Sequence, residues 1–529
     1  MTRQDRRLFL CLAIAITLAM GTSIRNGFVY DDVPIIVNNP LVTDPAHWAK
    51  IFQSTYWPGA IWRPLTVAGF ALQWYLGHGA PWLFHTVSLA LYLLLAWCAF
   101  RLLREIGAPL AAAAAAVLAF VVHPLHVEVV ANVVGQAELL AATSMVVATW
   151  AYLHARRRGF TLPRLLTVLA AIAIGTMAKE QGFVAPAMLL GAEWLLVPER
   201  GESWRSRIRL LLPATAFTML MLVVRSTVAG SLSGGYTTTA LVGLDLRDRL
   251  VTFIATVPEY ARLLVWPLHL QAEYAPPHLP IAGPITARHV VGIALVLLMV
   301  GTFLRCRRRL PLVAFGLWWA AVAIGPVSSV FTVVGIVMAE RVFFIPTVGF
   351  ALALAGTLAW LGEHAPHLWR LATATVMALW VTGATLRSAV RVPVWHDQDR
   401  FFNQLTIDGR NDYRAWRIAG NYWLAAGHRT RGEENLREAL RLWPHDAGTN
   451  ETLGQLLRGQ ARCLEAIPIL RQGLTVEPDR TAVRAKLLEC LISLHDTSAA
   501  LAVAEAGIAL GDSSFVPARS RLLASPVPR

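Results

Sequence analysis

The sequence has 529 residues, of which 56% are hydrophobic and only 15% are charged. Its mean hydropathy is +0.51, and typical globular domains carry roughly 25% charged residues. This composition excludes a disordered chain and disfavours a purely soluble protein. The net charge of +14 would normally suggest a nucleic-acid ligand, but in a membrane protein the same excess can collect in cytoplasmic loops. The positions of the basic residues therefore decide between these explanations.

About eleven apolar runs have roughly the length needed to cross a hydrocarbon core of about 30 Å. In chain order they lie near 8–24, 82–101, 109–124, 137–154, 163–178, 182–197, 209–225, 287–304, 311–328, 342–360 and 369–387. The first run follows three arginines, and we interpret it as an uncleaved anchor because the apolar segment Phe28-Val29-Tyr30 follows it. The sequence therefore predicts an all-helical, polytopic membrane bundle.

Basic residues are distributed unequally between alternate loops. If the N-terminus is cytoplasmic, the cytoplasmic loops contain arginines near 101–104, 156–164, 200–209, 305–309 and 370. The opposite loops are longer but hold fewer basic residues, as the positive-inside rule requires. This orientation explains the net charge without a nucleic acid and predicts that the segment after residue 387 lies outside the cytoplasm.

A repeat begins near residue 410, where the composition becomes polar. Pro444 and Pro478 lie 34 residues apart, and the first unit has the spacing Trp416, Gly420, Trp423. This period and pattern are typical of tetratricopeptide repeats, which form an α-solenoid. We predict about three repeats over 410–515, separate from a membrane domain over 1–395. Concave repeat surfaces usually bind peptides or proteins, although a scaffold without a specific partner is the alternative.

Common cofactor and metal signatures are missing from the sequence. The five cysteines are scattered without a CxxC pair, so neither a zinc site nor a disulfide framework is indicated. The sequence has no P-loop, no GxGxxG segment ahead of a helix and no GxSxG elbow. Nucleotide hydrolysis, a dinucleotide cofactor and hydrolase-elbow chemistry are therefore disfavoured.

Ionisable residues near the ends of the apolar runs fall mainly on the predicted outer side. Such residues are costly beside a membrane and are candidates for function. They are Asp31, Asp32, His123, His126, Glu128, Glu138, Lys179, Glu180, Glu259, Glu273, His278, Glu340 and Arg341.

Adjacent carboxylates occur in the first predicted outer loop. Because neighbouring side chains cannot point the same way, either Asp31 or Asp32 can face a reacting hydroxyl as a general base while a cation or a helix N-terminus holds the other. The alternative is a simple helix-capping pair.

Two further groups have alternative interpretations. His123, His126 and Glu128 resemble metal ligands, but we favour a hydrogen-bonded loop that shapes a substrate pocket, with no metal site assigned and a divalent metal left open. Lys179 and Arg341 would suit the phosphate of a lipid-linked donor. The segment around Lys179 and Glu180 would otherwise hold an ion pair that satisfies a helical hairpin.

Several motifs occur together in a specific order. They are GFVYDDVPIIVNNP at 27–40, WRPLT at 62–66, PWLFH at 81–85, HPLHVEVVANVVGQAE at 123–138, AKEQG at 178–182, WP at 266–267 with EY at 273–274, and AERVFFIP at 339–346. With the C-terminal repeats, the chain resembles the transmembrane and tetratricopeptide-repeat O-mannosyltransferases, which are polytopic glycosyltransferases of the GT-C class.

The resemblance implies inverting transfer of a sugar from a polyprenyl-phosphate donor to a hydroxyl of a protein or envelope acceptor. Asp31 and Asp32 would be catalytic. The residues expected to contact donor or acceptor are Arg63, His123, His126, Glu128, Glu138, Lys179, Glu180, Glu273, Tyr274, Glu340 and Arg341.

Two features differ from the animal relatives, namely the small number of repeats and a composition rich in Ala and Arg. These features favour a bacterial member in an inner membrane, with its active site and repeats on the periplasmic side. Its donor would be an undecaprenyl-phosphate sugar, and a protein would bind to the repeats. A non-catalytic assembly factor that anchors the repeats is the alternative function. A transporter is less favoured because no inverted internal repeat is evident.

Overall fold

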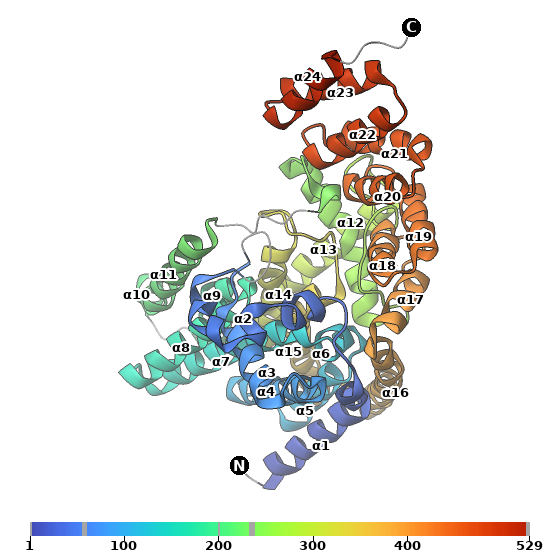
Figure 1. The fold of residues 1–529 in the computed structure, drawn as a ribbon. Coiled ribbons are helices and arrows are strands. Elements are labelled where there is room, and N and C mark those ends of the chain that lie inside the picture. The colour runs from blue at the N-terminus through green and yellow to red at the C-terminus, as the bar shows by residue number, and fades with distance from the viewer. Residues whose placement is uncertain (1–2, 56–60, 199–201, 232–237, 525–529) are drawn as a thin grey trace. The chain divides into compact units, whose positions relative to one another are not determined.

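The computed structural model describes residues 3–55, 61–198, 202–231 and 238–524. Throughout these ranges the regular elements are helices, and β-structure is limited to isolated bridges such as that between Pro277 and Asp412. Figure 1 shows the succession of helices along the chain. The predicted all-helical class is confirmed.

The chain divides into two compact units. The first contains Met1–Thr237, Asp245–Ala272 and Ala282–Phe401, and the second contains Thr238–Leu244, Glu273–Ile281 and Phe402–Arg529. The division at Phe401 lies between the predicted domain limits of 395 and 410. The second unit also includes two short segments from within the apolar part of the sequence, which the sequence analysis had placed in the membrane domain.

The first unit is built from α1 (Arg3–Met20), α2 (Pro40–Thr43), α3 (Pro64–Gly77), α4 (Pro81–Ile106), α5 (Leu110–Val121), α6 (Val127–Ala131), α7 (Gln136–Arg158), α8 (Leu162–Ala178), α9 (Ala185–Leu196), α10 (Trp204–Arg209), α11 (Leu212–Ala229), α12 (Leu246–Val265), α13 (Ala287–Cys306), α14 (Pro311–Ile324), α15 (Glu340–His364) and α16 (His367–Arg391). The helix α7 is buried along most of its length and packs against α4, α8 and α9. It therefore forms the centre of this unit.

Within the described residues, six helical segments are long and apolar enough to cross a membrane, or seven if a bent pair counts as one span. They are Arg3–Arg25, Pro81–Ile106, Val133–Arg158, Leu212–Ala229, Ala287–Cys306 and Glu340–His364, and the bent pair is Leu110–Val121 with Pro124–Ala131. This is fewer than the predicted number of about eleven. All the predicted runs do contain helix, but α8, α9 and α14 are short, and α16 is not among the sufficiently apolar helices.

The bend of 51° between α5 and the following helical segment lies at His123-Pro124. Proline removes a backbone donor and favours a break in a helix. The chain therefore turns within this apolar stretch and places α6 at an angle to α5. The helix α6 carries Glu128, so this local break determines where one of the candidate site residues lies.

Two glycines bring α14 and α15 into close backbone contact. A Cβ atom added to Gly349 would lie 2.4 Å from the carbonyl oxygen of Gly316, and one added to Gly316 would lie 2.3 Å from that of Gly349. Small residues allow such approach between membrane helices, where van der Waals packing drives association. This contact positions α15, whose first turn contains Glu340 and Arg341.

The second unit contains the C-terminal part of α17 (Gln398–Asp408), followed by α18 (Tyr413–Ala425), α19 (Arg429–Leu442), α20 (Ala447–Gly459), α21 (Cys463–Val476), α22 (Thr481–Ser493), α23 (Thr497–Ala509) and α24 (Val516–Ala524). Successive pairs from α18 to α23 pack together around a leucine-rich core. Asp412 and Asp446 cap the N-termini of α18 and α20. Pro444 and Pro478 follow the ends of α19 and α21, as the repeat pattern predicts.

A disulfide joins Cys463 at the start of α21 to Cys490 in α22, with a Cα–Cα distance of 5.1 Å. The expectation of no disulfide was therefore wrong. The two cysteines are separated by 27 residues, and only the packing of neighbouring helices brings them together. A search for closely spaced cysteine pairs could not find this bond.

The glycine contact predicts a large effect of Gly349→Val on folding. The added side chain would meet backbone atoms of α14, and overpacking of this kind costs about 1–3 kcal/mol or more. Thermal unfolding in detergent should show a lower midpoint than in the wild type. Gly301→Val in α13 is the control, since a Cβ there meets no atom within 4 Å; equal midpoints for the two variants would contradict the proposed contact.

Candidate active site

Asp32 is completely buried in the segment that follows α1. Its carboxylate accepts hydrogen bonds from the backbone N–H groups of Val29 at 3.3 Å, Val133 at 3.3 Å and Val134 at 2.9 Å. Burial raises the pKa of Asp32 to about 7, although these three N–H groups act in the opposite direction. The side chain therefore connects the first loop to the turn that precedes α7.

The turn whose N–H groups donate to Asp32 is tight. It contains the short helix η5 (Val133–Gly135), and a Cβ atom on Gly135 would lie 2.0 Å from the carbonyl oxygen of Val129. Glycine is therefore required for the chain to fold back this closely. This local geometry presents the N–H groups of Val133 and Val134 to the carboxylate.

Asp31 has a different environment from its neighbour. Its side chain is 23% exposed, and its Oδ2 lies 3.9 Å from Nη2 of Arg341. Arg341 also donates to Glu128, from its backbone N–H at 2.9 Å and from Nη1 at 2.5 Å. Three charged residues from three distant parts of the sequence therefore meet at this point, and only one member of the acidic pair belongs to the exposed part of the cluster.

The predicted phosphate-binding residue Lys179 has a carboxylate partner. Lys179, which follows α8, forms a buried ion pair with Glu138 in the first turn of α7. The adjacent Glu180 accepts a hydrogen bond at 2.7 Å from Nη2 of Arg63 and another at 3.0 Å from its Nε. The segment between α8 and α9 is thus attached to α7 and to the start of α3.

The two histidines connect helices within the bundle. His126 contacts the hydroxyl of Tyr92 at 2.7 Å through Nδ1 and that of Thr347 at 2.9 Å through Nε2. His123 contacts the carbonyl oxygen of Leu264 at 3.0 Å and caps its own turn through Leu125. Across the described ranges, no three His, Cys, Asp or Glu residues form a group suited to a metal ion.

The remaining predicted residues lie in two different places. Glu340, next to Arg341, accepts a hydrogen bond from the backbone N–H of Gln271 at 2.7 Å. Glu273 and Tyr274 belong to the second unit, where Glu273 forms an ion pair with Arg414 at 2.8 Å. Glu273 and Tyr274 therefore belong to a different unit from the acidic pair. Arg414 was not among the predicted site residues.

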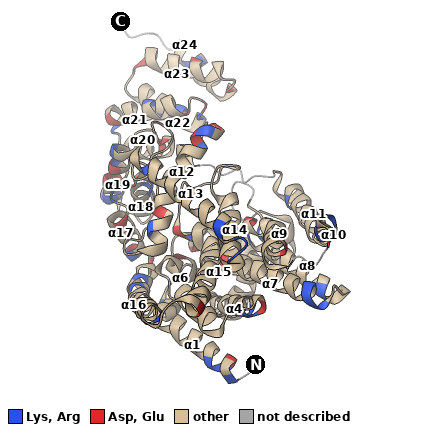
Figure 2. Ribbon diagram, turned by 180° about the vertical axis from the view of Figure 1, so that it is seen from behind, with Lys and Arg blue, Asp and Glu red and all other residues tan. Residues whose placement is uncertain are grey.

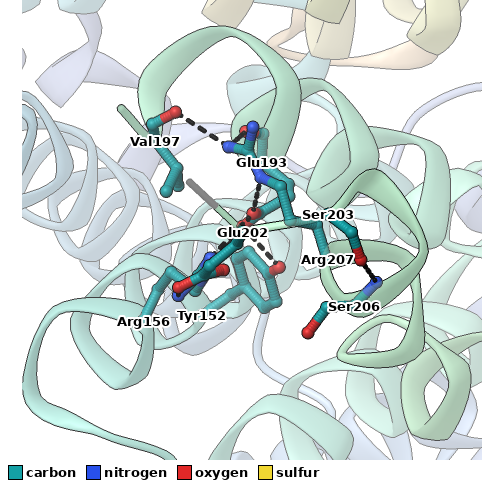
Figure 3. Close-up of polar contacts among 8 residues, drawn as sticks. All are labelled: Tyr152, Arg156, Glu193, Val197, Glu202, Ser203, Ser206 and Arg207. Carbon is teal, nitrogen blue, oxygen red and sulfur yellow. Dashed lines mark hydrogen bonds and ion pairs between the residues drawn. The ribbon is translucent and has the colours of Figure 1, made fainter. Parts of the chain in front are cut away.

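A second buried cluster surrounds Glu193, in α9. Figure 3 shows that its carboxylate accepts hydrogen bonds from Tyr152, Arg156 and Arg207, of which the shortest, at 2.6 Å, comes from Nε of Arg207. Glu193 was not among the predicted site residues, although a single acidic residue within the run LLGAEWLLV is a detectable signal. The neighbouring arginines were interpreted only as determinants of topology.

The two ion-pair clusters lie near opposite ends of α7. Glu138 is in its first turn and Arg156 in its last, which corresponds to about 27 Å at 1.5 Å per residue. This distance is close to the thickness of a hydrocarbon core. Figure 2 shows Lys and Arg residues gathered near the junction of α7 with α8 and on α10, at the Glu193 end. The geometry thus agrees with a membrane-spanning α7 that has a basic side at its C-terminal end.

These features define a polytopic helical membrane protein with a clustered set of charged side chains. Its sequence is similar to curated proteins named protein O-mannosyl-transferase TMTC. It is 25% identical to TMTC3 of Mus musculus over 488 residues, which cover 83% of this chain and 51% of that protein. It is 25% identical to TMTC1 of Homo sapiens over 508 residues, which cover 85% and 57%. The predicted resemblance is confirmed, and the chain spans about half the length of these relatives.

Other similarities cover less of the chain or are weaker. A shorter stretch of 198 residues is 33% identical to Tmtc2 of Drosophila melanogaster, covering 35% of this chain and 21% of that protein. The solved structure of the archaeal oligosaccharyltransferase AglB from Archaeoglobus fulgidus aligns over 76% of this chain and 57% of its own, with 14% identity and a TM-score of 0.46. No protein-family model matches the chain.

The Glu193 cluster predicts that Glu193→Gln strongly destabilises the protein. The substitution removes the carboxylate that pairs with the buried Arg207, and breaking a buried ion pair costs about 3–5 kcal/mol. Thermal unfolding in detergent should reveal this loss. Glu202→Gln is the control because that carboxylate also contacts Arg156 but has a side chain that is 37% exposed, so its effect should stay within about 1 kcal/mol. The reverse order of the two effects would contradict the role of Glu193.

Proposed function

We propose that the protein is a membrane glycosyltransferase of the GT-C class. It transfers a sugar from a polyprenyl-phosphate donor to a hydroxyl of a protein or envelope acceptor on the non-cytoplasmic side. The observation that carries this proposal is the partly exposed Asp31 beside Arg341, next to a neighbour that is completely buried. The names of the relatives that align with more than four fifths of the chain support the same chemistry.

Asp31 is the general base in this mechanism. Its carboxylate takes the proton of the acceptor hydroxyl while the acceptor oxygen forms a bond to the anomeric carbon. The bond between this carbon and the phosphate oxygen breaks, and the phosphate leaves with the electron pair. Because attack and departure occur on opposite faces of the sugar, the anomeric configuration inverts. Asp32 is a positioning residue, since its carboxylate is enclosed and its oxygens are occupied by backbone N–H groups.

The departing phosphate requires positive charge. Arg341 and Lys179 supply it, and each cation is held in place by a carboxylate, namely Glu128 and Glu138. Donors that are fixed before the reaction stabilise developing charge without the cost of reorganisation. Arg63, held by Glu180, is the third cation in this proposal, and His123 and His126 support the surrounding helices.

The proposed roles predict different effects for the two aspartates. Asp31→Asn should lower kcat for transfer from a lipid-phosphate sugar by about 10²–10⁴-fold, the range for loss of a general base, with little change in thermal stability. Asp32→Asn should chiefly change thermal stability, since its oxygens hold two segments together. Activity and unfolding are measured on the same purified preparations.

The outcomes also separate the proposal from its alternatives. Full activity in both variants would refute a catalytic acidic pair. A loss of kcat only in Asp32→Asn, at unchanged stability, would exchange the two roles. The non-catalytic scaffold predicts two other results. The wild-type protein would show no transfer activity, and its C-terminal helices, tethered to the membrane by any single span, would restore its cellular function.

The repeats and the active site lie outside the cytoplasm in this proposal, in a bacterial inner membrane facing the periplasm. The distribution of basic residues supports this orientation. The disulfide between Cys463 and Cys490 supports it independently, because disulfides persist in oxidising compartments and are rare in the cytosol. The C-terminal unit would act there as a set of tetratricopeptide repeats that binds a protein partner.

The orientation predicts the redox state of these two cysteines in cells. In a variant with Cys11, Cys98 and Cys306 replaced by serine, a mass-adding maleimide applied to denatured protein should label no thiol before reduction and two after it. Cys463→Ser is the control and should leave one thiol reactive without reduction. Two free thiols in protein taken directly from cells would contradict an oxidising location for the repeats.

A further inference from the structure

The segment between α16, the last of the predicted spans, and the C-terminal helices is packed into the first unit. After α16 ends at Arg391, the chain forms η9 (Val392–Trp395) and then enters α17. The side chains of Val392, Trp395 and Phe401 are each at most 1% exposed. A linker between two domains would normally be exposed and polar, so this burial calls for a structural or functional reason. We refer to residues 392–401 as the post-span segment.

The post-span segment contacts the loop that carries the acidic pair. The backbone N–H of Gly27 donates to the carbonyl oxygen of His396 at 2.8 Å. The ring of Phe401 stacks on that of Tyr30, with centroids 5.2 Å apart and an interplanar angle of 25°. The ring of Trp395 packs against that of Phe401, with centroids 4.5 Å apart. The ring of Phe401 therefore contacts both Tyr30 and Trp395, and Tyr30 directly precedes Asp31 in the chain.

The same segment also reaches the elements that hold the rest of the charged cluster. The helix η9 packs against α6, which carries Glu128. In the preceding helix, the hydroxyl of Ser388 donates to the carbonyl oxygen of Val122 at 2.8 Å, next to the break between α5 and α6. The post-span segment thus contacts the carriers of Asp31 and of Glu128, the carboxylate that binds Arg341.

Tyr30 needs such support because of its backbone. It has a φ of +57°, a left-handed conformation that is rare for a bulky residue and persists only where the surroundings maintain it. The residue directly precedes Asp31, so this conformation sets the direction of the following carboxylate. The stack with Phe401 is a contact to the ring of Tyr30 from a distant part of the sequence.

We propose that the post-span segment is a positioning element of the active site, in which Phe401 and Trp395 hold Tyr30 and thereby direct Asp31 toward Arg341. This inference rests on the proposed function, because it assigns the segment to the transfer reaction. Neither ring contacts a reacting atom in this scheme. Their loss therefore affects the orientation of the base and lowers kcat, while donor binding by the cations remains.

The experiment compares Phe401→Leu with Phe402→Leu in the full-length protein. The two phenylalanines are neighbours in α17 and are both buried, but Phe402 stacks on Tyr422 of the second unit, at 4.1 Å. Phe401→Leu should lower kcat by about 10-fold or more, since small displacements of reacting groups cost up to about 10²-fold. The donor KM should change by less than about twofold. Hydrogen exchange of the peptide covering 27–34 should become faster in the same variant.

The control variant and the wild type make the result decisive. Phe402→Leu should leave both kcat and the exchange of 27–34 unchanged, and an equal fall in both variants would show general destabilisation and overturn the proposal. An active Phe401→Leu protein with unchanged exchange would overturn it while leaving the proposed function intact. Absence of transfer by the wild type would instead refute the proposed function, and the exchange rates alone would then decide whether the segment holds the acidic loop.

Discussion

The burial of Asp32 is the constraint on which the arrangement of the candidate active site depends. A carboxyl group in apolar surroundings is costly unless hydrogen bonds satisfy it, and here three backbone N–H groups do so. Two of these groups belong to the turn before α7, so a single side chain fixes the first loop to the central helix of the bundle. Once Asp32 is enclosed, Asp31 is left on the exposed side of the loop beside Arg341. The difference between two adjacent, chemically identical residues thus comes entirely from their surroundings.

The other charges of the first unit follow the same physical rule. An unpaired charge near a membrane interior is strongly unfavourable, and the cations of this region are held by carboxylates from other helices: Lys179 by Glu138 and Arg207 by Glu193. Such pairs attach helices to one another, and here one pair lies near each end of α7. The arginines near the C-terminal end of α7 consequently have two effects. They favour a cytoplasmic position for their loop, and they also fix α7, α9 and α10 through a buried acid.

The sequence predicts the helical elements and part of the site, because these depend on local composition and on motifs. Each predicted apolar run contains helix, and Asp31, Glu128 and Arg341 do meet. Fewer helices than predicted runs are both long and apolar enough to span a membrane, because some runs contain only a short helix, such as the 12 residues of α9. The partner of Lys179 was not evident, since Glu180 is adjacent in sequence while Glu138 is adjacent in space. The disulfide, Glu193 and the stacking of Phe401 on Tyr30 were missed for the same reason, because each depends on contacts between distant segments.

Access to the acidic pair favours Asp31 over Asp32 as the base. An acceptor hydroxyl must approach the carboxylate within hydrogen-bonding distance, and Asp32 has no exposed surface through which a macromolecular acceptor can approach. Asp31 has exposed surface and lies 3.9 Å from a guanidinium nitrogen of Arg341. A reaction at Asp31 therefore needs no opening of the loop, whereas a reaction at Asp32 would require the hydrogen bonds to Val133 and Val134 to break first.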